Sequence, residues 1–369
     1  MILKTQEFKE ACQTILFAID TKDVSLFNET LELVTNGNIL NLNVTNREYF
    51  VTVKFILEQA EEFRASVNAK TFLALISKIT TDTVELTLDG NILRIKANGN
   101  YALPLIFNDD KMLELPVINL GTLTNEMEIN SDILLSILAN NSKELLRGIA
   151  ARPVQKCYYV DNLGAITFTS GACVNSFTLP KEIKLLLSDK VVKLFRLFKP
   201  DNLINFSMGQ NPISENLIQT NIRFSTDKVV LTATLLESGL ISSVPVEAIR
   251  NMAQKTYPHT LVLDRSLLLR LLNRIILFND ESKTYGNFEV NNNVLTIKDF
   301  NSNSTESISA AGNSNLIDSY RFILDLKNLK LILDGSTDQY ITMCFGDGRA
   351  VVIKKQNVTD IIPEIRVNI

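Results

Sequence analysis

Basic side chains gather on four segments of this sequence, residues 69–79, 189–199, 265–277 and 326–333, which also have the apolar spacing of short amphipathic helices. The basic residues of these segments are Lys70, Lys78, Lys190, Lys193, Arg196, Lys199, Arg265, Arg270, Arg274, Lys327 and Lys330. Their only acidic residue is Asp189, although the whole chain contains 37 basic and 41 acidic residues. A single lysine on a helix is usually just solvated. Eleven basic residues against one acidic residue instead indicate faces that bind a polyanion.

The inventory of reactive residues argues against catalysis. The chain has one histidine, His259, which follows Pro258 in a stretch that we predict to be a solvated linker. We find no glycine motif that could cradle phosphates, no Cys/His spacing typical of a metal site, and no Ser/His/Asp set that can be placed. Paired carboxylates could come together anywhere in a fold, so a hydrolytic enzyme with a carboxylate cluster stays a disfavoured alternative.

Composition and cysteine usage indicate a globular protein of ordinary type. Hydrophobic residues make up 46% of the chain and charged residues 21%, with a net charge of -4. No run approaches the ~20 apolar residues of a membrane span, and the first residues lack the pattern of a signal peptide. We therefore expect a cytoplasmic protein without a membrane partner. The cysteines, Cys12, Cys157, Cys173 and Cys344, lie far apart in apolar stretches, which predicts free, buried thiols.

The elements that must position the basic faces recur along the chain as one repeated unit, seen most clearly in residues 63–107. Asn68 is a good N-cap for a short amphipathic helix, and three antiparallel strands follow, the first two joined by a turn at Asp89 and Gly90. Pro104 cannot donate to a sheet ladder, so the third strand should lie at an edge or contain a bulge. The unit therefore reads strand, helix and three antiparallel strands.

Copies of this unit begin at regular intervals. Each begins with a capping residue ahead of an apolar stripe, at Thr5, Asn68, Ser131, Ser188, Asp264 and Asp325. The intervals lie between 57 and 76 residues. Because two such units can bury their helices together against sheet, we predict three α+β domains, at residues 1–120, 121–250 and 251–369. Linkers are expected near 119–124 and 244–255.

The sequence resembles a known family, the bacterial β sliding clamps, which are the processivity subunit of DNA polymerase III. The resemblance spans the chain and is carried by LTLDGNILRIKANGNYAL, by CYYVDNLGAITFTSGACV, and by LLLRLLNRIILFNDESKTYGNFEVNNNVLTI with the terminal IIPEIRVNI. In that family two subunits close head to tail into a ring, with twelve helices lining the hole and sheet forming the outer wall. The resemblance thus implies an α+β fold of three tandem clamp domains, each made of two helix-plus-antiparallel-sheet repeats, that closes into a ring as a homodimer.

The resemblance also implies a function. The chain would encircle double-stranded DNA without reading its sequence, tether a replicative DNA polymerase, and be opened by a clamp loader, with no catalysis and no cofactor. Its place would be the nucleoid or replication site. A clamp-like scaffold that recruits replication or host proteins without encircling DNA is the alternative.

Three sets of site residues follow from the repeat and the resemblance together. The DNA-facing set comprises Lys70, Lys190, Lys193, Arg196, Arg270, Arg274, Lys327 and Lys330 on helices, with Lys22, Arg147, Arg152, Lys156 and Tyr158 expected on loops at the rim. The partner-peptide pocket comprises Thr169, Gly171, Val174, Ile361, Ile362, Pro363 and Ile365, expected to form an exposed apolar cleft. The dimer interface comprises Tyr101, Leu103, Ile276 and Leu277.

The sequence departs from the family at the predicted pocket. The usual T-D-G-H-R-L pattern reads TSGACV from Thr169 to Val174, so its histidine and arginine are missing. The expected phenylalanine-proline pair is replaced by Ile241 and Ser242. These departures suggest a divergent clamp, with a phage or plasmid origin left open, whose partners carry a different peptide motif.

Overall fold

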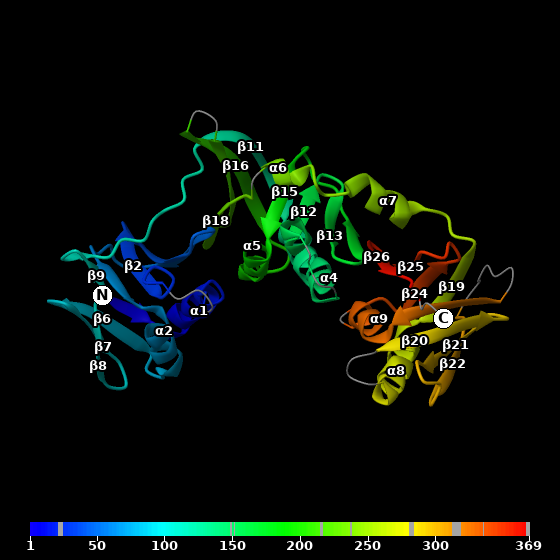
Figure 1. The fold of residues 1–369 in the computed structure, drawn as a ribbon. Coiled ribbons are helices and arrows are strands. Elements are labelled where there is room, and N and C mark those ends of the chain that lie inside the picture. The colour runs from blue at the N-terminus through cyan, green and yellow to red at the C-terminus, as the bar shows by residue number, and fades with distance from the viewer. Residues whose placement is uncertain are drawn as a thin grey trace. The chain divides into compact units, whose positions relative to one another are not determined.

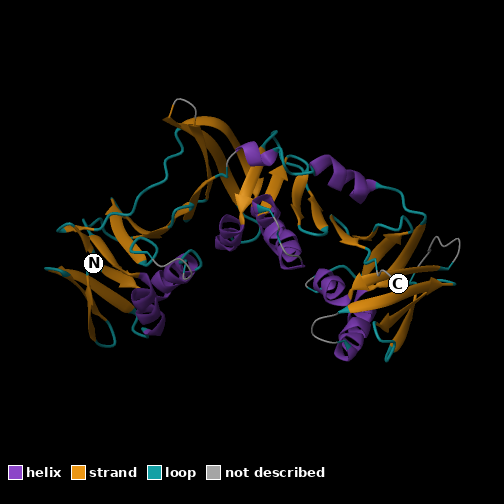
Figure 2. Cartoon of the chain, in the orientation of Figure 1, coloured by secondary structure: helices purple, strands orange, loops and turns teal. Residues whose placement is uncertain are grey.

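The structure is a computed structural model that describes residues 1–20, 25–147, 150, 152–214, 217–236, 238–279, 284–311, 319–334 and 336–366 (Figure 1). Its residues form two compact units, Met1–Leu135 with Lys190–Glu237, and Ser136–Asp189 with Ser238–Ile369. Helices and strands alternate along the chain in a regular order (Figure 2). That order is the predicted strand, helix and three strands, repeated six times.

The first two repeats lie within the first unit. The first comprises β1 (Ile2–Lys4), α1 (Thr5–Leu16), β2 (Thr30–Asn36), β3 (Ile39–Thr45) and β4 (Tyr49–Ile56). The second comprises β5 (Arg64–Asn68), α2 (Ala69–Lys78), β6 (Thr83–Asp89), β7 (Ile92–Lys96) and β8 (Asn100–Pro104), and is followed by the small hairpin of β9 (Phe107–Asn108) and β10 (Lys111–Met112).

The third and fourth repeats each contribute to both units. The third comprises β11 (Thr122–Asn130), α3 (Ser131–Ser136), η1 (Ile137–Asn141), α4 (Ser142–Arg147), η2 (Pro153–Lys156), β12 (Cys157–Asp161), β13 (Gly164–Phe168) and β14 (Ala172–Ser176). The fourth comprises β15 (Lys184–Ser188), α5 (Asp189–Lys193), η3 (Leu194–Leu197), β16 (Leu203–Ser214), β17 (Leu217–Ser225) and β18 (Val229–Thr234).

The last two repeats lie within the second unit, after two connecting helices, α6 (Ser238–Ile241) and α7 (Val246–Gln254). The fifth comprises β19 (His259–Asp264), α8 (Arg265–Ile275), η4 (Ile276–Phe278), β20 (Tyr285–Asn291), β21 (Val294–Asp299) and β22 (Thr305–Ser309). The sixth comprises β23 (Tyr320–Asp325), α9 (Leu326–Leu333), β24 (Tyr340–Phe345), β25 (Ala350–Lys354) and β26 (Val358–Pro363).

In the first unit, two sheets enclose the packed pair α1 and α2. One sheet has the order β1-β6-β7-β8, and the other has the order β11-β16-β17-β18-β4-β3-β2-β5. Phe8 on α1 meets Phe72 on α2 edge to face at 6.2 Å between ring centroids, and both rings are fully buried. The edge position of β8 confirms the prediction made from Pro104.

The second unit repeats this arrangement with α8 and α9. Its sheets have the orders β15-β12-β13-β14-β26-β25-β24-β19 and β22-β21-β20-β23. One buried core contains Leu268 and Leu272 of α8, Leu329 of α9, and Phe288 and Phe345 from the two sheets. This packing buries one side of each helix and leaves the opposite side for polar residues.

The three-domain division stays a prediction. The pairing of β4 with β18 makes one sheet continuous across the first predicted boundary, and the pairing of β14 with β26 does the same across the second. The predicted linker at 244–255 contains α7, and the predicted second domain is divided between the two units.

Local capping signals position the helices as predicted. The side chains of Asn68, Asp264 and Asp325 each accept a hydrogen bond from the backbone N–H three residues later, at 2.8 to 3.0 Å. Thr5 and Ser131 differ from the prediction, because each is the first residue of its helix, α1 or α3, and not the capping residue before it. These caps fix which face of each helix meets the core.

Two predictions about reactive residues have opposite outcomes. All four cysteines are free and buried, which confirms the prediction. His259 is not a solvated linker residue: it begins β19, is buried, and packs its ring against Tyr320 and Phe345. The prediction was wrong because the alternating residues of β19 begin at His259 itself, directly after Pro258. The histidine therefore occupies the first inward-facing position of the strand.

Candidate nucleic-acid interface and partner surfaces

The predicted DNA-facing residues on helices lie on the sides that the cores leave uncovered. Six are exposed and two are half-buried: the exposed ones are Lys70, Lys193, Arg196, Arg270, Arg274 and Lys327, and the half-buried ones are Lys190 and Lys330. On α8, Leu271 and Ile275 are buried whereas Arg270 and Arg274 are exposed, as expected of a helix seated on sheet. Lys22 lies outside the described residues.

Several of these cations are already paired with acids from other segments, which sequence reasoning missed. Lys190 contacts Asp20 at 3.1 Å and Glu48 at 3.5 Å. Lys330 contacts Asp334 at 3.1 Å. Such pairs reduce the positive field of the helices, and phosphate must compete with carboxylates for them.

The strongest of these pairs joins α8 to β22. The Arg274 guanidinium donates from Nε to Glu306 Oε1 at 2.6 Å and from Nη2 to the other carboxylate oxygen. The hydrogen bond from Arg274 lowers the pKa of Glu306, and the same bond raises the pKa of Arg274, so both groups stay charged. Helical spacing alone does not reveal this pair, because Glu306 belongs to a strand.

An aromatic ring that the sequence reading did not single out lies beside one predicted cation. The Arg196 guanidinium lies 5.6 Å from the centroid of the exposed Phe17 ring. Its Nε also donates to the carbonyl of Lys193 at 2.6 Å. Arg196 is therefore held in place by its own unit.

Two of the predicted rim contacts are wrong. Arg152 and Lys156 are exposed, but the Arg147 side chain is only 4% exposed and Tyr158 is fully buried. Arg147 is not on a loop, because the helix that begins at Ser131 continues through the π-helical turn η1 into α4. Tyr158 belongs to β12 and its hydroxyl donates to Asp189 at 3.1 Å; burial raises its pKa.

Arg147 instead belongs to a buried ion-pair network that ties α4 to β26. It contacts Glu144 and, at 3.2 Å, Asp360, which also contacts Lys355 at 2.8 Å. Glu144 accepts hydrogen bonds from the backbone N–H and the hydroxyl of Thr169. Each of these charges therefore has a partner inside the protein, as buried charges require.

The predicted pocket residues come together, but most of them are packed rather than exposed. Strands β14 and β26 pair directly, and α7 packs against both. The buried members are Thr169, Val174, Ile361 and Ile362; Pro363 is exposed, and Gly171 and Ile365 are half-buried. The prediction of an exposed cleft is therefore wrong for the four buried residues. Val174 belongs to β14, and Ile361 and Ile362 belong to β26, two strands in which most residues are buried.

Gly171 has a steric role at this junction. A Cβ atom there would lie 2.3 Å from the carbonyl oxygen of Ile361, so only glycine allows the two strands this approach. The family pattern retained at Gly171 thus reflects sheet packing in this structure.

Two of the predicted interface residues lie on an edge strand, and the other two lie in the short helix η4 that follows α8. Tyr101 is 37% exposed and Leu103 is half-buried on β8, the edge of its sheet. Leu277 is 80% exposed and Ile276 half-buried in η4, and β22 is likewise an edge strand. Unpaired edges and exposed apolar residues are what an added strand from another chain would cover.

Among the described residues, no group of three or more His, Cys, Asp or Glu side chains could hold a metal ion. The same part of the chain contains no helix that is long and apolar enough to cross a membrane.

Comparisons with known proteins agree with this architecture. No family model matches the chain. The β sliding clamp of Mycoplasmopsis pulmonis is 32% identical over 118 residues, which are 32% of this chain and 30% of that protein, so the match spans about a third of the curated relative.

Solved structures match along the whole chain. The DNA polymerase III subunit beta of Pseudomonas aeruginosa superposes with a TM-score of 0.80 at 14% identity, covering 99% of both chains. The DNA polymerase sliding clamp of Bacillus subtilis gives 0.78 at 14% identity, covering 99% of this chain and 98% of that one. The Helicobacter pylori β clamp gives 0.78 at 13% identity, covering 100% of both. The chain therefore has the fold of the bacterial β sliding clamps over its whole length, and about a third of it is similar in sequence to one of them.

Proposed function

We propose that this chain is a DNA sliding clamp: two copies close into a ring around duplex DNA and tether a replicative DNA polymerase, without catalysis by the chain itself. A clamp loader opens the ring. The observation that carries the proposal is the full-length fold match together with the basic, uncovered faces of α2, α8 and α9.

Such a ring would be held on DNA by its closed topology. It does not need to grip DNA tightly, because a closed ring leaves DNA only at an end. Diffuse Lys and Arg contacts to phosphates keep the duplex centred and carry no sequence information. Lys70, Arg270 and Lys327 suit this role, since they are exposed and none takes part in an ion pair found among the described residues.

The dimer would form by joining the open edges of β8 and β22 from two copies. Tyr101 and Leu103 would pack against Ile276 and Leu277 of the second copy, which would extend both sheets. Partner proteins would dock on the outer surface near the end of β26, around Pro363 and Ile365.

A threading experiment tests encirclement without a clamp loader. The chain is incubated with linear duplex DNA that carries biotin at both ends, streptavidin is added, and the mixture is then washed at moderate salt. A ring that has threaded onto the DNA is retained by blocked ends and lost from the same DNA without streptavidin. Equal retention in both arms would instead support the non-encircling scaffold, and no retention in either arm would contradict DNA encirclement.

A further inference from the structure

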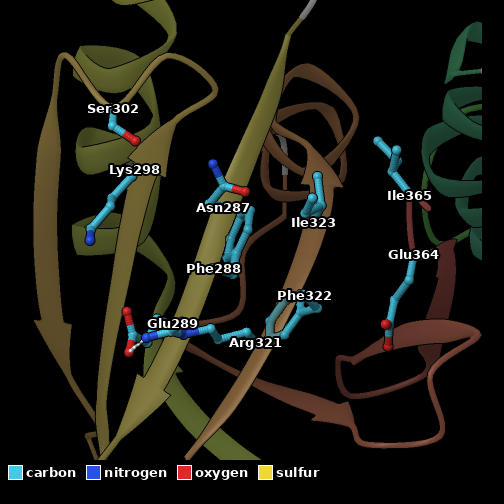
Figure 3. A pocket seen from close by; sticks show the side chains of 10 residues that line it. All are labelled: Asn287, Phe288, Glu289, Lys298, Ser302, Arg321, Phe322, Ile323, Glu364 and Ile365. Atoms are coloured by element: carbon cyan, nitrogen blue, oxygen red, sulfur yellow. Dashed lines mark hydrogen bonds and ion pairs between the residues drawn. The ribbon is translucent and has the colours of Figure 1, made fainter. Parts of the chain in front are cut away.

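A groove of about 520 Å³ lies on the outer face of the sheet formed by β20, β21 and β23, away from the core that α8 and α9 fill (Figure 3). Its size falls within the range of about 300–1,000 Å³ typical of ligand sites. The lining side chains on the sheet are Asn287, Glu289, Lys298, Arg321 and Ile323. Alternation along the strands explains the groove, because Phe288 and Phe322 point into the core and their neighbours point outward.

The other wall is the segment that follows β26. The N–H of Glu364 donates to the carbonyl of Arg349, and the N–H of Ile365 donates to the carbonyl of Ile323, both at 2.9 Å. The segment is thereby fixed beside the edge strand β23. Figure 3 shows Glu364 and Ile365 across from Ile323 and Phe322.

Charges in the groove are not all compensated. Glu289 and Arg321 face each other in register on neighbouring strands and form an ion pair at 2.8 Å. Glu364 differs: no ion pair of its carboxylate is found among the described residues, and its Oε1 is buried without a hydrogen-bond partner there. Burial and the nearby Asp347 carboxylate raise the pKa of Glu364, while Arg366 opposes them. A carboxylate held in this way favours an incoming cation.

We propose that this groove binds a short peptide segment of a partner protein, in which a basic side chain pairs with Glu364 and a neighbouring aliphatic side chain packs on Ile323 and Ile365. Charge complementarity selects the basic residue, because one wall offers a carboxylate that forms no ion pair with the other described residues. Duplex DNA suits the groove less well, since the Glu364 carboxylate repels phosphate although Lys298 also lines the groove.

The inference rests on the proposed function only in taking the chain to recruit other proteins. The test contains no DNA. A chain that does not encircle DNA could therefore still bind the peptides, and a chain that does form a ring around DNA could fail to bind them. The probes are three fluorescein-labelled, C-terminally amidated pentapeptides that differ only at the centre: Ala-Ile-Lys-Ile-Ala, and the same peptide with Gln or Glu in place of Lys. Binding to the full chain is followed by fluorescence anisotropy.

We expect the Lys peptide to bind about tenfold more tightly than the Gln peptide, the effect of one hydrogen bond between charged groups, and the Glu peptide to bind least. Glu364→Gln should make the Lys and Gln peptides equal, and Ile323→Ser should weaken both. Glu247→Gln removes an exposed acid of α7 outside the groove and should leave the preference intact.

Absence of binding by all three peptides up to millimolar concentration would overturn the proposal. So would a Lys preference that survives Glu364→Gln, or one that Glu247→Gln removes equally. Matching thermal melts of the two glutamine variants separate loss of the site from loss of the fold.

Discussion

Arg274 on α8 and Glu306 on β22 form a bidentate ion pair, in which the guanidinium donates from Nε and Nη2 to the two carboxylate oxygens. The pair ties a cation of the predicted DNA-facing set to the edge strand proposed to join two copies. Glu306 and a DNA phosphate would therefore compete for the same guanidinium. Phosphate contact would need this cation available, whereas the pair keeps it engaged within its own domain.

Glu306→Gln should strengthen DNA binding. Removing the carboxylate charge frees the Arg274 guanidinium for phosphate, so affinity for a duplex should rise and the slope of log affinity against log salt should steepen by roughly 0.9 for one added phosphate contact. Fluorescence anisotropy with a labelled duplex between 50 and 200 mM salt measures both. Glu128→Gln, an exposed acid on β11, is the charge-matched control. An equal gain in the control would show that only net charge matters.

Reversing the charge of the cations that form no ion pair with other described residues should have the opposite effect. Lys70→Glu, Arg270→Glu and Lys327→Glu together remove three exposed cations and add three acids. Retention on end-blocked DNA should therefore be lost. The slope of log affinity against log salt should become shallower by the equivalent of roughly three phosphate contacts. Melting should barely change, because exposed charges contribute little to stability. The comparison variant is Lys190→Gln with Lys330→Gln, whose cations are already engaged by acids. If that variant lost as much retention as the triple reversal, the distinction between paired and unpaired cations would be wrong.

Arg147 should matter for stability rather than for DNA contact. Arg147→Met keeps much of the side-chain volume but leaves the buried Glu144 without an ion pair among the described residues and Asp360 paired only with Lys355, which costs about 3–5 kcal/mol. The midpoint of urea unfolding should fall accordingly. Arg152→Met, at an exposed position nearby, should change stability by less than about 0.5 kcal/mol. A variant of Arg147 with normal stability and weakened DNA binding would restore the original rim assignment.

The attachment of α7 should depend on pH through Asp161. Burial acts to raise the pKa of this carboxyl, but hydrogen bonds from Arg250, Leu163 and Tyr159 outweigh it and lower the pKa below the ordinary 3.8. A lowered pKa gives a stabilising contribution that is present above the ordinary value and is lost as pH falls through the folded-state pKa. Arg250 lies on α7 and its guanidinium reaches Asp161 at 2.6 Å.

Arg250→Met should therefore destabilise the protein at pH 7, and the difference from the unmodified chain should shrink as pH falls below 3.8. Urea midpoints of both proteins at pH 7 and pH 3 measure this. A difference that stays constant between the two pH values would mean that Arg250 acts through packing alone.

The repeat could be predicted from the sequence because its signals are local. Asn68, Asp264 and Asp325 cap the helices that directly follow them, and the turn at Gly90, with a φ of 57°, joins strands only a few residues apart. Such signals need no knowledge of the rest of the fold. The three-strand groups and the basic helix faces follow from them.

The pairing of charges could not be predicted in this way. Whether Arg147 is buried depends on Asp360, which β26 brings beside β14 from the other end of the chain. The π-helical turn at η1 also carries the helix past the point where its apolar spacing breaks, which hid the helical position of Arg147. Tertiary contacts, rather than local spacing, decide which cations remain available.

Leu277 offers the sharpest test of ring closure. An apolar side chain that is 80% exposed stabilises nothing within one chain, so Leu277→Ser should leave melting unchanged. If β22 and η4 meet β8 of a second copy, the same substitution places a hydroxyl against Tyr101 and Leu103, and the dimer should dissociate at low micromolar concentration. Light scattering after gel filtration would then give the mass of one chain instead of two. Leu146→Ser is the matched control, since Leu146 is 74% exposed on α4, which is part of neither edge strand nor η4. Loss of the dimer in the control, or its persistence in Leu277→Ser, would place the interface elsewhere on the chain.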